Sequence, residues 1–251
     1  MKDAARKTAL VTGGGRDIGR GIAEELGRQG YHVIIHANQS RDGAEEASRK
    51  IERVGAVASV VQADLATPEG PTKLVDDVIQ ILAKRTLDVL VLNAAATFAV
   101  PVGSREAGSI EVMTRVNLIS PVVITNGLQH HMSDGASILA LSVAATRSVF
   151  SPDFAFFAST KSAMETMVRG WARALGPRRI RVNAVSPGVV AVNFRAKLLQ
   201  DEEFRAELHG DTALGRAGRV DDVVSVIRFL VSAESGWITG QVVEASGGWR
   251  L

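Results

Sequence analysis

The sequence predicts an α/β fold, a doubly wound parallel sheet with helices on both faces, in one three-layer domain. Apolar strand-like runs alternate with amphipathic helical stretches from the start of the chain. The run Val89–Leu92 is wholly apolar, as expected of a strand that is covered on both faces. A glycine-rich turn stands directly between the first strand and the first helix. Together these three observations predict the fold class.

The first half of the chain repeats the strand–helix alternation before the strand at Val89–Leu92. Pro68 suits the start of a helix, because the first turn leaves its N–H groups unbonded and proline has none. The earlier expected strands are Thr8–Val11, His32–Ala37 and Val57–Ala63, and the expected helices are Ile18–Gln29, Arg41–Val54 and Pro68–Leu82.

The second half opens with one long expected helix at Ile110–His131. After Pro187-Gly188 the pattern loosens as far as Gly218, and we expect a substrate lid over about 188–218. Because no linker or repeat divides the chain, residues 1–251 are expected to form a single domain. The other expected elements are strands at Ser137–Leu141, Arg181–Val185 and Val242–Glu244, and helices at Ala155–Leu175 and Val220–Ser232.

Composition excludes several classes of protein. Hydrophobic residues make up 46% of the chain and charged residues 22%, which excludes a disordered protein. A net charge of +2 argues against a nucleic-acid partner. The absence of cysteine excludes thiolate catalysis, and no His, Asp and Glu grouping has metal spacing, so no metal is expected. Without a signal-type segment or a bilayer-length apolar run, we expect a cytoplasmic protein with no membrane partner.

The turn Thr12–Gly19 carries the first functional signal. Its glycines let backbone N–H groups approach a pyrophosphate at the positive end of the following helix. Its place between an apolar strand and a helix favours nucleotide binding over a tight connection alone. The candidate cofactor residues of this turn are Gly13, Gly15, Arg16, Asp17, Ile18 and Gly19.

Further motifs follow in order along the whole chain. They are Asp64-Leu65, Asn93-Ala94-Ala95, Asn117, the run Arg181–Gly188, Ile238-Thr239-Gly240 and Gly247-Gly248. With the glycine turn, they resemble the short-chain dehydrogenase/reductase family, close to its 3-oxoacyl carrier-protein reductases. The resemblance implies a Rossmann-like fold, carbonyl reduction and a homotetramer. Asp17 stands where the family has its middle glycine, and we expect its side chain to turn outward and to weaken cofactor binding.

The residues after the second strand favour NADP(H) over NAD(H). An NAD enzyme usually has an acid there to hold the ribose hydroxyls, whereas this chain has Ala37, Asn38, Gln39 and Ser40. Arg16 resembles the family's basic residue against the 2′-phosphate, a dianion that a guanidinium suits. The resemblance places Asp64-Leu65 beside the adenine. It also assigns Asn93, Ala94, Ala95, Lys161, Pro187, Gly188, Val190 and Val192 to the cofactor site.

The resemblance places the catalytic chemistry on Asn117, Ser142, Phe157 and Lys161. In the family a serine stabilises the alkoxide formed by hydride transfer, and a tyrosine protonates it. The lysine lowers the tyrosine pKa and binds the nicotinamide ribose, while the asparagine holds a water. Here Phe157 takes the tyrosine position, one turn before Lys161, and the only tyrosine, Tyr31, is far away in sequence. The lost hydroxyl is expected to slow ketone reduction by about 10²–10⁴-fold.

Four explanations of Phe157 remain open. The chain is an engineered Tyr-to-Phe form of a ketone or 3-oxoacyl reductase, since the surrounding pattern is intact. Alternatively, it is a natural reductase of imines, which need no acid from the protein. A third explanation is reduction of activated C=C bonds with another proton donor. A fourth is an inactive NADP-binding sensor or scaffold, against which the retained Asn117, Ser142 and Lys161 argue.

Apolar side chains are expected to surround the substrate. The lid carries Phe194, Leu198, Leu199, Phe204 and Leu208 at helical spacing. The candidate substrate residues are Ser142, Ala144, Phe150, Phe157, Phe194 and Trp249. This set favours an apolar or aromatic carbonyl, or the corresponding imine, over a sugar.

Overall fold

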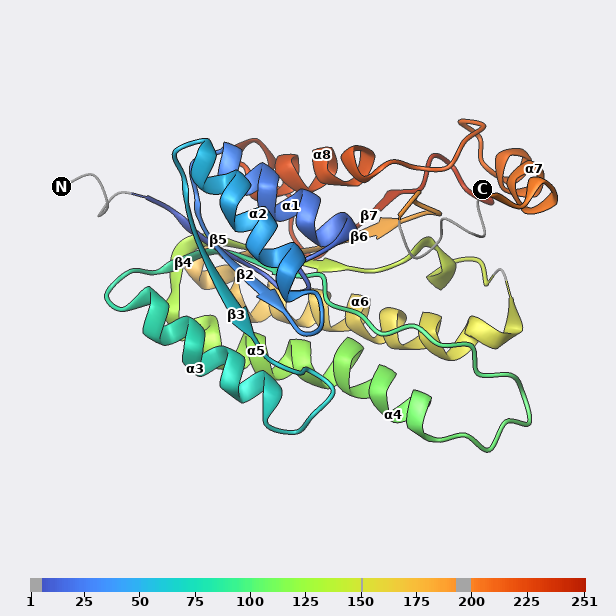
Figure 1. The fold of residues 1–251 in the computed structure, drawn as a ribbon, viewed down its shortest axis with the longest axis horizontal. Helices are drawn as coiled ribbons and strands as arrows, with labels where there is room; N and C mark the ends of the chain where they lie inside the picture. Colours follow the sequence, from blue (N-terminus) through green and yellow to red (C-terminus); the bar gives the residue numbers. More distant parts are fainter. Residues whose placement is uncertain (1–5, 150, 193–199) are drawn as a thin grey trace.

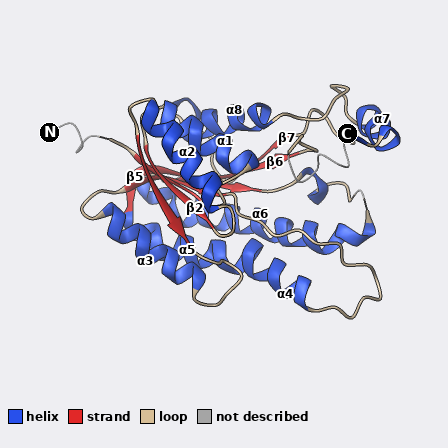
Figure 2. Ribbon diagram, in the orientation of Figure 1, coloured by secondary structure: helices blue, strands red, loops and turns tan. Residues whose placement is uncertain are grey.

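Seven parallel strands form one sheet through the middle of the computed structural model, which describes residues 6–149, 151–192 and 200–251 (Figures 1 and 2). The strands are β1 (Thr8–Val11), β2 (His32–Ala37), β3 (Val57–Gln62), β4 (Leu87–Leu92), β5 (Met132–Leu141), β6 (Arg181–Pro187) and β7 (Val242–Ala245). Their order is β3-β2-β1-β4-β5-β6-β7, which confirms the predicted doubly wound sheet. The order reverses between β1 and β4, so the loops after these strands flank the crevice where such sheets bind ligands.

Helices cover both faces of the sheet (Figure 1). One face carries α1 (Asp17–Arg28), α2 (Arg41–Arg53) and α8 (Val220–Val231). The other face carries α3 (Gly70–Leu82), α4 (Gly108–Thr114), α5 (Ser120–Leu128) and α6 (Ala155–Leu175). The helix α7 (Glu202–Asp211) lies apart from both layers, near the C-terminus. Short 3-10 turns occur at Ala144–Thr146, Pro152–Phe154, Gly176–Arg178 and Ala233–Ser235.

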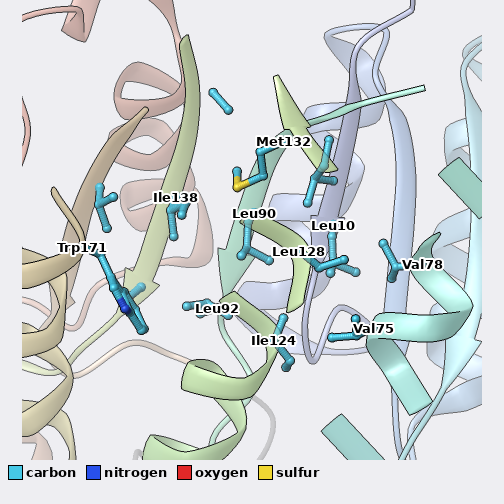
Figure 3. Close-up of a cluster of buried hydrophobic side chains, with 14 of the residues drawn as sticks. Leu10, Val75, Val78, Leu90, Leu92, Ile124, Leu128, Met132, Ile138 and Trp171 are labelled. Carbon is cyan, nitrogen blue, oxygen red and sulfur yellow. The ribbon is translucent and has the colours of Figure 1, made fainter. Parts of the chain in front are cut away.

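Alternate strand residues divide the core into two layers, because successive side chains point to opposite faces of a sheet. Leu10 and Leu90 point toward α3 and α5, where Figure 3 shows them among Val78, Ile124 and Leu128. Their neighbours in sequence pack on the other face, against α1 and α8. Burial of both faces explains why the strand at β4 is apolar throughout rather than at every second residue.

The predicted helix at Ile110–His131 is not one regular α-helix. α4 runs into a π-helical turn at Arg115–Ile119, α5 follows, and a 3-10 turn at Gln129–His131 ends the segment. A single π-helical turn changes the spacing of apolar residues along the helix over only a few positions. The apolar pattern of the sequence is therefore too little altered to predict the turn. Such turns are frequent at functional sites, and Asn117 lies buried in this one.

β5 begins at Met132 rather than at the predicted Ser137. Met132 pairs with Leu87, and the register then shifts before Ser137 pairs with Val89. Exposed polar residues within this irregular part look like a turn in the sequence, which is why the prediction began too late.

The described part of the segment predicted as a lid, about 188–218, contains the helix α7. The Asp201 side chain caps this helix by accepting the Phe204 N–H at 3.0 Å. Phe204 and the buried Leu208 pack with Ala144 and Trp249 in a small apolar cluster beside the sheet. The predicted lid residues Phe194, Leu198 and Leu199 lie outside the described residues. None of the helices in the described ranges is long and apolar enough to cross a membrane.

Candidate active site

The loops after β1 and β4 are tied together where the strand order reverses. Asn93 Nδ2 donates to the backbone oxygens of Thr12, at 2.9 Å, and of Gly13, at 3.1 Å. In return, Thr12 Oγ1 accepts the N–H groups of Asn93, at 2.9 Å, and of Ala94, at 3.0 Å. Asn93 and Ala94 therefore hold the glycine turn in shape, a role that their place in the predicted cofactor set did not specify.

The glycine turn is too tight to hold side chains at two of its positions. A Cβ added to Gly15 would lie 2.3 Å from the Ser40 backbone oxygen, and one on Gly19 would lie 2.2 Å from that of Gly13. Arg16, which precedes α1, provides no side-chain cap for the helix. A bare backbone at an uncapped helix N-terminus fits the diphosphate of a dinucleotide.

Asp17 adopts a backbone conformation that normally favours glycine, with φ at +51°. Its side chain is only 12% exposed, and Oδ2 lies 4.0 Å from Arg16 Nε. The expectation that Asp17 turns outward is therefore wrong. A carboxylate held at the start of α1 repels a phosphate at the same helix end.

Asp17→Gly is expected to tighten NADPH binding roughly five- to thirty-fold, because removing a nearby like charge is worth on the order of 1–2 kcal/mol. Fluorescence titration with NADPH measures this, and Asp17→Asn separates the charge from the backbone strain. Arg179→Gly relieves a similar φ of +59° at another turn and should leave the NADPH Kd unchanged. Unchanged affinity in Asp17→Gly would contradict the assignment of the turn.

His36 braces the glycine turn from β2. Its Nδ1 accepts the Gly13 N–H at 3.1 Å, and its Nε2 lies 3.1 Å from the Ala63 backbone oxygen. Because a carbonyl only accepts, Nε2 carries the proton and the ring is neutral. Burial lowers the pKa of His36 below its ordinary 6.5, and the nearby charged groups are Asp64, which raises the pKa, and Lys73, which lowers it.

NADPH affinity is expected to fall as the pH drops below about 6.5, because a protonated His36 cannot accept the Gly13 N–H. The free energy of unfolding falls over the same range, since a depressed folded-state pKa means that the unfolded chain binds the proton first. His36→Phe should weaken NADPH binding roughly three- to ten-fold near neutral pH and remove this pH dependence. His32→Phe, on the same strand but bonded to Ser59 Oγ at 2.9 Å, is the matched control.

The residues predicted for the adenosine end lie at the C-terminal ends of β1, β2 and β3 and in the loops that follow them. Arg16 is exposed, whereas Ala37 is buried, and the backbone oxygen of Asn38 accepts a hydrogen bond from the Gln62 side chain at 2.9 Å. Gln39 is exposed, and Ser40 packs on Gly15. Asp64 is exposed, but the Leu65 side chain is in the core and contributes no surface. Ile18 also packs against the core.

Lys161 lies fully buried on α6, one turn after Phe157. Its Nζ donates to the Leu141 backbone oxygen at 2.8 Å, and burial lowers its pKa from 10.5 to about 8. Asn117 clamps the loop after β4: its amide oxygen accepts the Ala96 N–H at 2.8 Å, and its amide nitrogen donates to the Ala96 oxygen and to Thr160 Oγ1. These bonds use both amide hydrogens, so the Asn117 side chain has no hydrogen left to donate to a water.

A cavity of about 660 Å³ lies beside α6, α7 and the C-terminal residues. Its lining is mostly apolar and includes Ala144, Phe157, Pro187, Gly188 and Trp249, all of them predicted site residues. Phe150 and Phe194 lie outside the described residues. The side chains of Val190 and Val192 belong to the core. The other lining residues are Thr97, Phe98, Ala99, Val143, Ala145, Phe154, Val189, Phe204, Glu207, Leu208, Asp211 and Arg250.

The Ser142 side chain is engaged within the protein, and its predicted place against the substrate stays a prediction. Among the described lining residues Val143 is present and Ser142 is not. Ser142 continues the face of β5 that packs against α6, and its hydroxyl donates to Glu165 Oε1 at 2.5 Å. Because side chains alternate along an extended chain, the neighbouring side chain of Val143 faces the cavity.

Glu165 is the polar residue near this site that sequence reasoning missed. Its Oε1 accepts hydrogen bonds from Ser142 and, at 3.0 Å, from Thr146. The available signal was its position one turn after Lys161, on the same face of the helix. No group of three or more His, Cys, Asp or Glu residues within the described ranges could hold a metal ion.

The strand order, the glycine turn at the reversal and the buried lysine beside the cavity define a dinucleotide-type reductase site. Residues 13–250 match the family model described as enoyl-(acyl carrier protein) reductase, and the chain belongs to this family of short-chain dehydrogenases/reductases.

Three relatives illustrate the likeness. An uncharacterized oxidoreductase of Methylorubrum extorquens is 35% identical over the full length of both chains. The angucycline C-6 ketoreductase LanV, solved with NADP, is 35% identical with a TM-score of 0.90, covering 97% of this chain and 95% of its own. A blue fluorescent protein from a metagenomic library, solved with NADPH, is 30% identical with a TM-score of 0.91 and covers 98% of both chains.

Proposed function

We propose that the chain is an NADP(H)-dependent reductase that delivers a hydride to an apolar, ring-containing substrate. The observation that carries the proposal is the aromatic-walled cavity lined by Phe157, one turn before the buried Lys161 on α6. LanV, similar in fold and sequence, is solved with NADP and with rabelomycin, which supports both the cofactor and the substrate type.

Each end of the cofactor has matching residues. The bare backbone at Gly15 and Gly19 would hold the diphosphate, and the exposed Arg16 would hold the 2′-phosphate. Lys161 would orient the nicotinamide ribose. When bound, the cofactor supplies the hydride, while the chain's own residues position the acceptor and exclude water from the cavity.

The relatives favour a carbonyl as acceptor, either a ketone or, as the resemblance to 3-oxoacyl reductases implies, a 3-oxoacyl group. In this chain the cavity wall offers Val143 and Phe157 where the chemistry of a ketone needs hydroxyls. We therefore expect slow ketone turnover. The engineered Tyr-to-Phe explanation and a natural reductase of imines or activated C=C bonds both remain open, and assays on the different acceptor classes distinguish them.

Direct titration with NADPH and NADH tests the cofactor, and assays on ketones, 3-oxoacyl thioesters, imines and enones test the reaction. NADPH is expected to bind more tightly, and Arg16→Ala is expected to narrow the difference. Tighter binding of NADH would overturn the cofactor assignment. NADPH binding without turnover of any acceptor class would instead support the sensor or scaffold alternative.

We also propose a homotetramer, as the family resemblance implies. Phe229, 40% exposed on α8, and the fully exposed Trp237 just after it support an interface at this end of the sheet. Light scattering at micromolar concentration tests the assembly, and a monomer would contradict it.

A further inference from the structure

We propose that the acceptor reduced in this cavity is a cationic C=N group, an iminium ion carried on an apolar ring system, rather than a neutral ketone. This inference rests on the proposed function and specifies its substrate class. Three features of the cavity support it: Val143 and Phe157 bring no hydroxyl to the wall, five aromatic side chains line it, and its charged lining residues carry an excess of negative charge.

The wall beside Lys161 cannot stabilise a developing alkoxide. Hydride addition to a ketone places negative charge on oxygen, which needs donors aimed at it. Val143 and Phe157 line the cavity here and offer none, and the nearby Ser142 hydroxyl is donated to Glu165. Among the described lining residues the one hydroxyl belongs to Thr97, on the exposed loop after β4.

Reduction of an iminium ion removes this requirement. The hydride and its electron pair pass from NADPH to the iminium carbon, where a C–H bond forms. The C=N π electrons become the nitrogen lone pair, and NADP⁺ leaves. The acceptor changes from a cation to a neutral amine, so no proton is needed and no anion forms.

Aromatic side chains make the cavity favourable for a cation. Phe98, Phe154, Phe157, Phe204 and Trp249 all line it, and the faces of such rings attract positive charge. One cation–π contact is already present in the protein: the guanidinium carbon of Arg250 lies 5.1 Å from the centroid of the Trp249 ring.

The charged residues that line the cavity also favour a cationic acceptor. Glu207 and Asp211 on α7 face a single cation, Arg250, which contacts Asp211 at 2.5 Å and Glu207 at 3.3 Å. The lining therefore keeps one negative charge in excess. Lys161 is the nearest further cation on α6 and keeps its charge at neutral pH, because burial lowers its pKa only to about 8. Its Nζ donates to the Leu141 backbone oxygen, and it is not among the described lining residues of the cavity.

The test compares acceptors of matched shape. With NADPH in excess, an N-methyl dihydroisoquinolinium salt is expected to be reduced at least about 100-fold faster than α-tetralone, given the usual worth of a lost acid. Equal or faster reduction of the ketone would overturn the inference, as would ketone reduction that is lost in Thr97→Val.

A binding measurement separates recognition of charge from turnover. Without cofactor, calorimetry should show the saturated N,N-dimethyl tetrahydroisoquinolinium cation binding more tightly than α-tetralone, and Glu207→Gln should reduce this preference roughly two- to five-fold. Glu203→Gln makes the same change on the same helix outside the cavity and should leave the preference unchanged. Tighter binding of α-tetralone than of the cation would overturn the inference. A separate titration of the same protein with NADPH, if it shows tight binding, means that the proposed function still stands.

Discussion

Introducing two hydroxyls into the cavity wall, with Val143→Ser and Phe157→Tyr in one chain, is expected to raise the rate of ketone reduction by roughly 10²–10⁴-fold. Both positions line the cavity beside Lys161, so the new hydroxyls would face the acceptor. The buried ammonium would also favour ionisation of the new tyrosine, which makes it a better acid–base group near neutral pH. Steady-state assays with NADPH and α-tetralone measure the gain.

The matched control is Phe154→Tyr, which adds a hydroxyl to the same cavity at another aromatic position. It should leave ketone reduction within a few-fold of the parent. We expect the single Phe157→Tyr variant to gain less than the double variant, because the alkoxide would still lack its second donor. A full gain from Phe157→Tyr alone would show that Val143 has no part in the departure.

Lys161→Met is expected to stabilise the fold while weakening NADPH binding at least roughly ten-fold. Burial lowers the pKa of Lys161 from 10.5 to about 8, so at neutral pH the folded state holds a charge that it disfavours. Removing that charge is worth on the order of 2–3 kcal/mol in free energy of unfolding, less the lost hydrogen bond to Leu141.

The stability difference between the parent and Lys161→Met is expected to depend on pH in a defined direction. Between about pH 8 and 10.5 the unfolded chain binds the Lys161 proton and the folded chain does not, so the stability of the parent rises with pH over that range. The advantage of Lys161→Met should be largest below pH 8 and should shrink toward pH 10.5. Urea unfolding at both ends of the range measures it, with Lys84→Met on the surface as control. A constant difference would mean that Lys161 does not titrate as stated.

Local patterns were sufficient for most of the elements. The bounds of β1, β2 and α6 match their predictions, because the apolar pattern of the sequence changes sharply at their ends. Long-range pairing decided the remainder. β5 extends back to Met132 because Leu87 lies beside it in the sheet, a contact that no local window contains.

The two ends of the site differed in how far the sequence could predict them. The glycine turn could be predicted because its function depends on residues without side chains, and glycines are read directly from the sequence. Its brace, His36, was not assigned that role, because β2 and β1 meet only in the folded sheet. At the catalytic end, the resemblance to the family assigned Ser142, whereas the direction in which its side chain points is decided only in the folded protein, where its hydroxyl donates to Glu165.

The sequence by itself determined the fold class, the bare phosphate turn and the aromatic residue in place of a tyrosine, because each depends on which side chains are present and in what order. Only the tertiary structure decided that Val143 rather than Ser142 lines the cavity, that Asp17 is held inward, and that two carboxylates face one guanidinium at the lid. These depend on the direction in which a side chain points and on which distant elements surround it. Both are fixed when strands and helices pack, so composition and spacing carry no record of them.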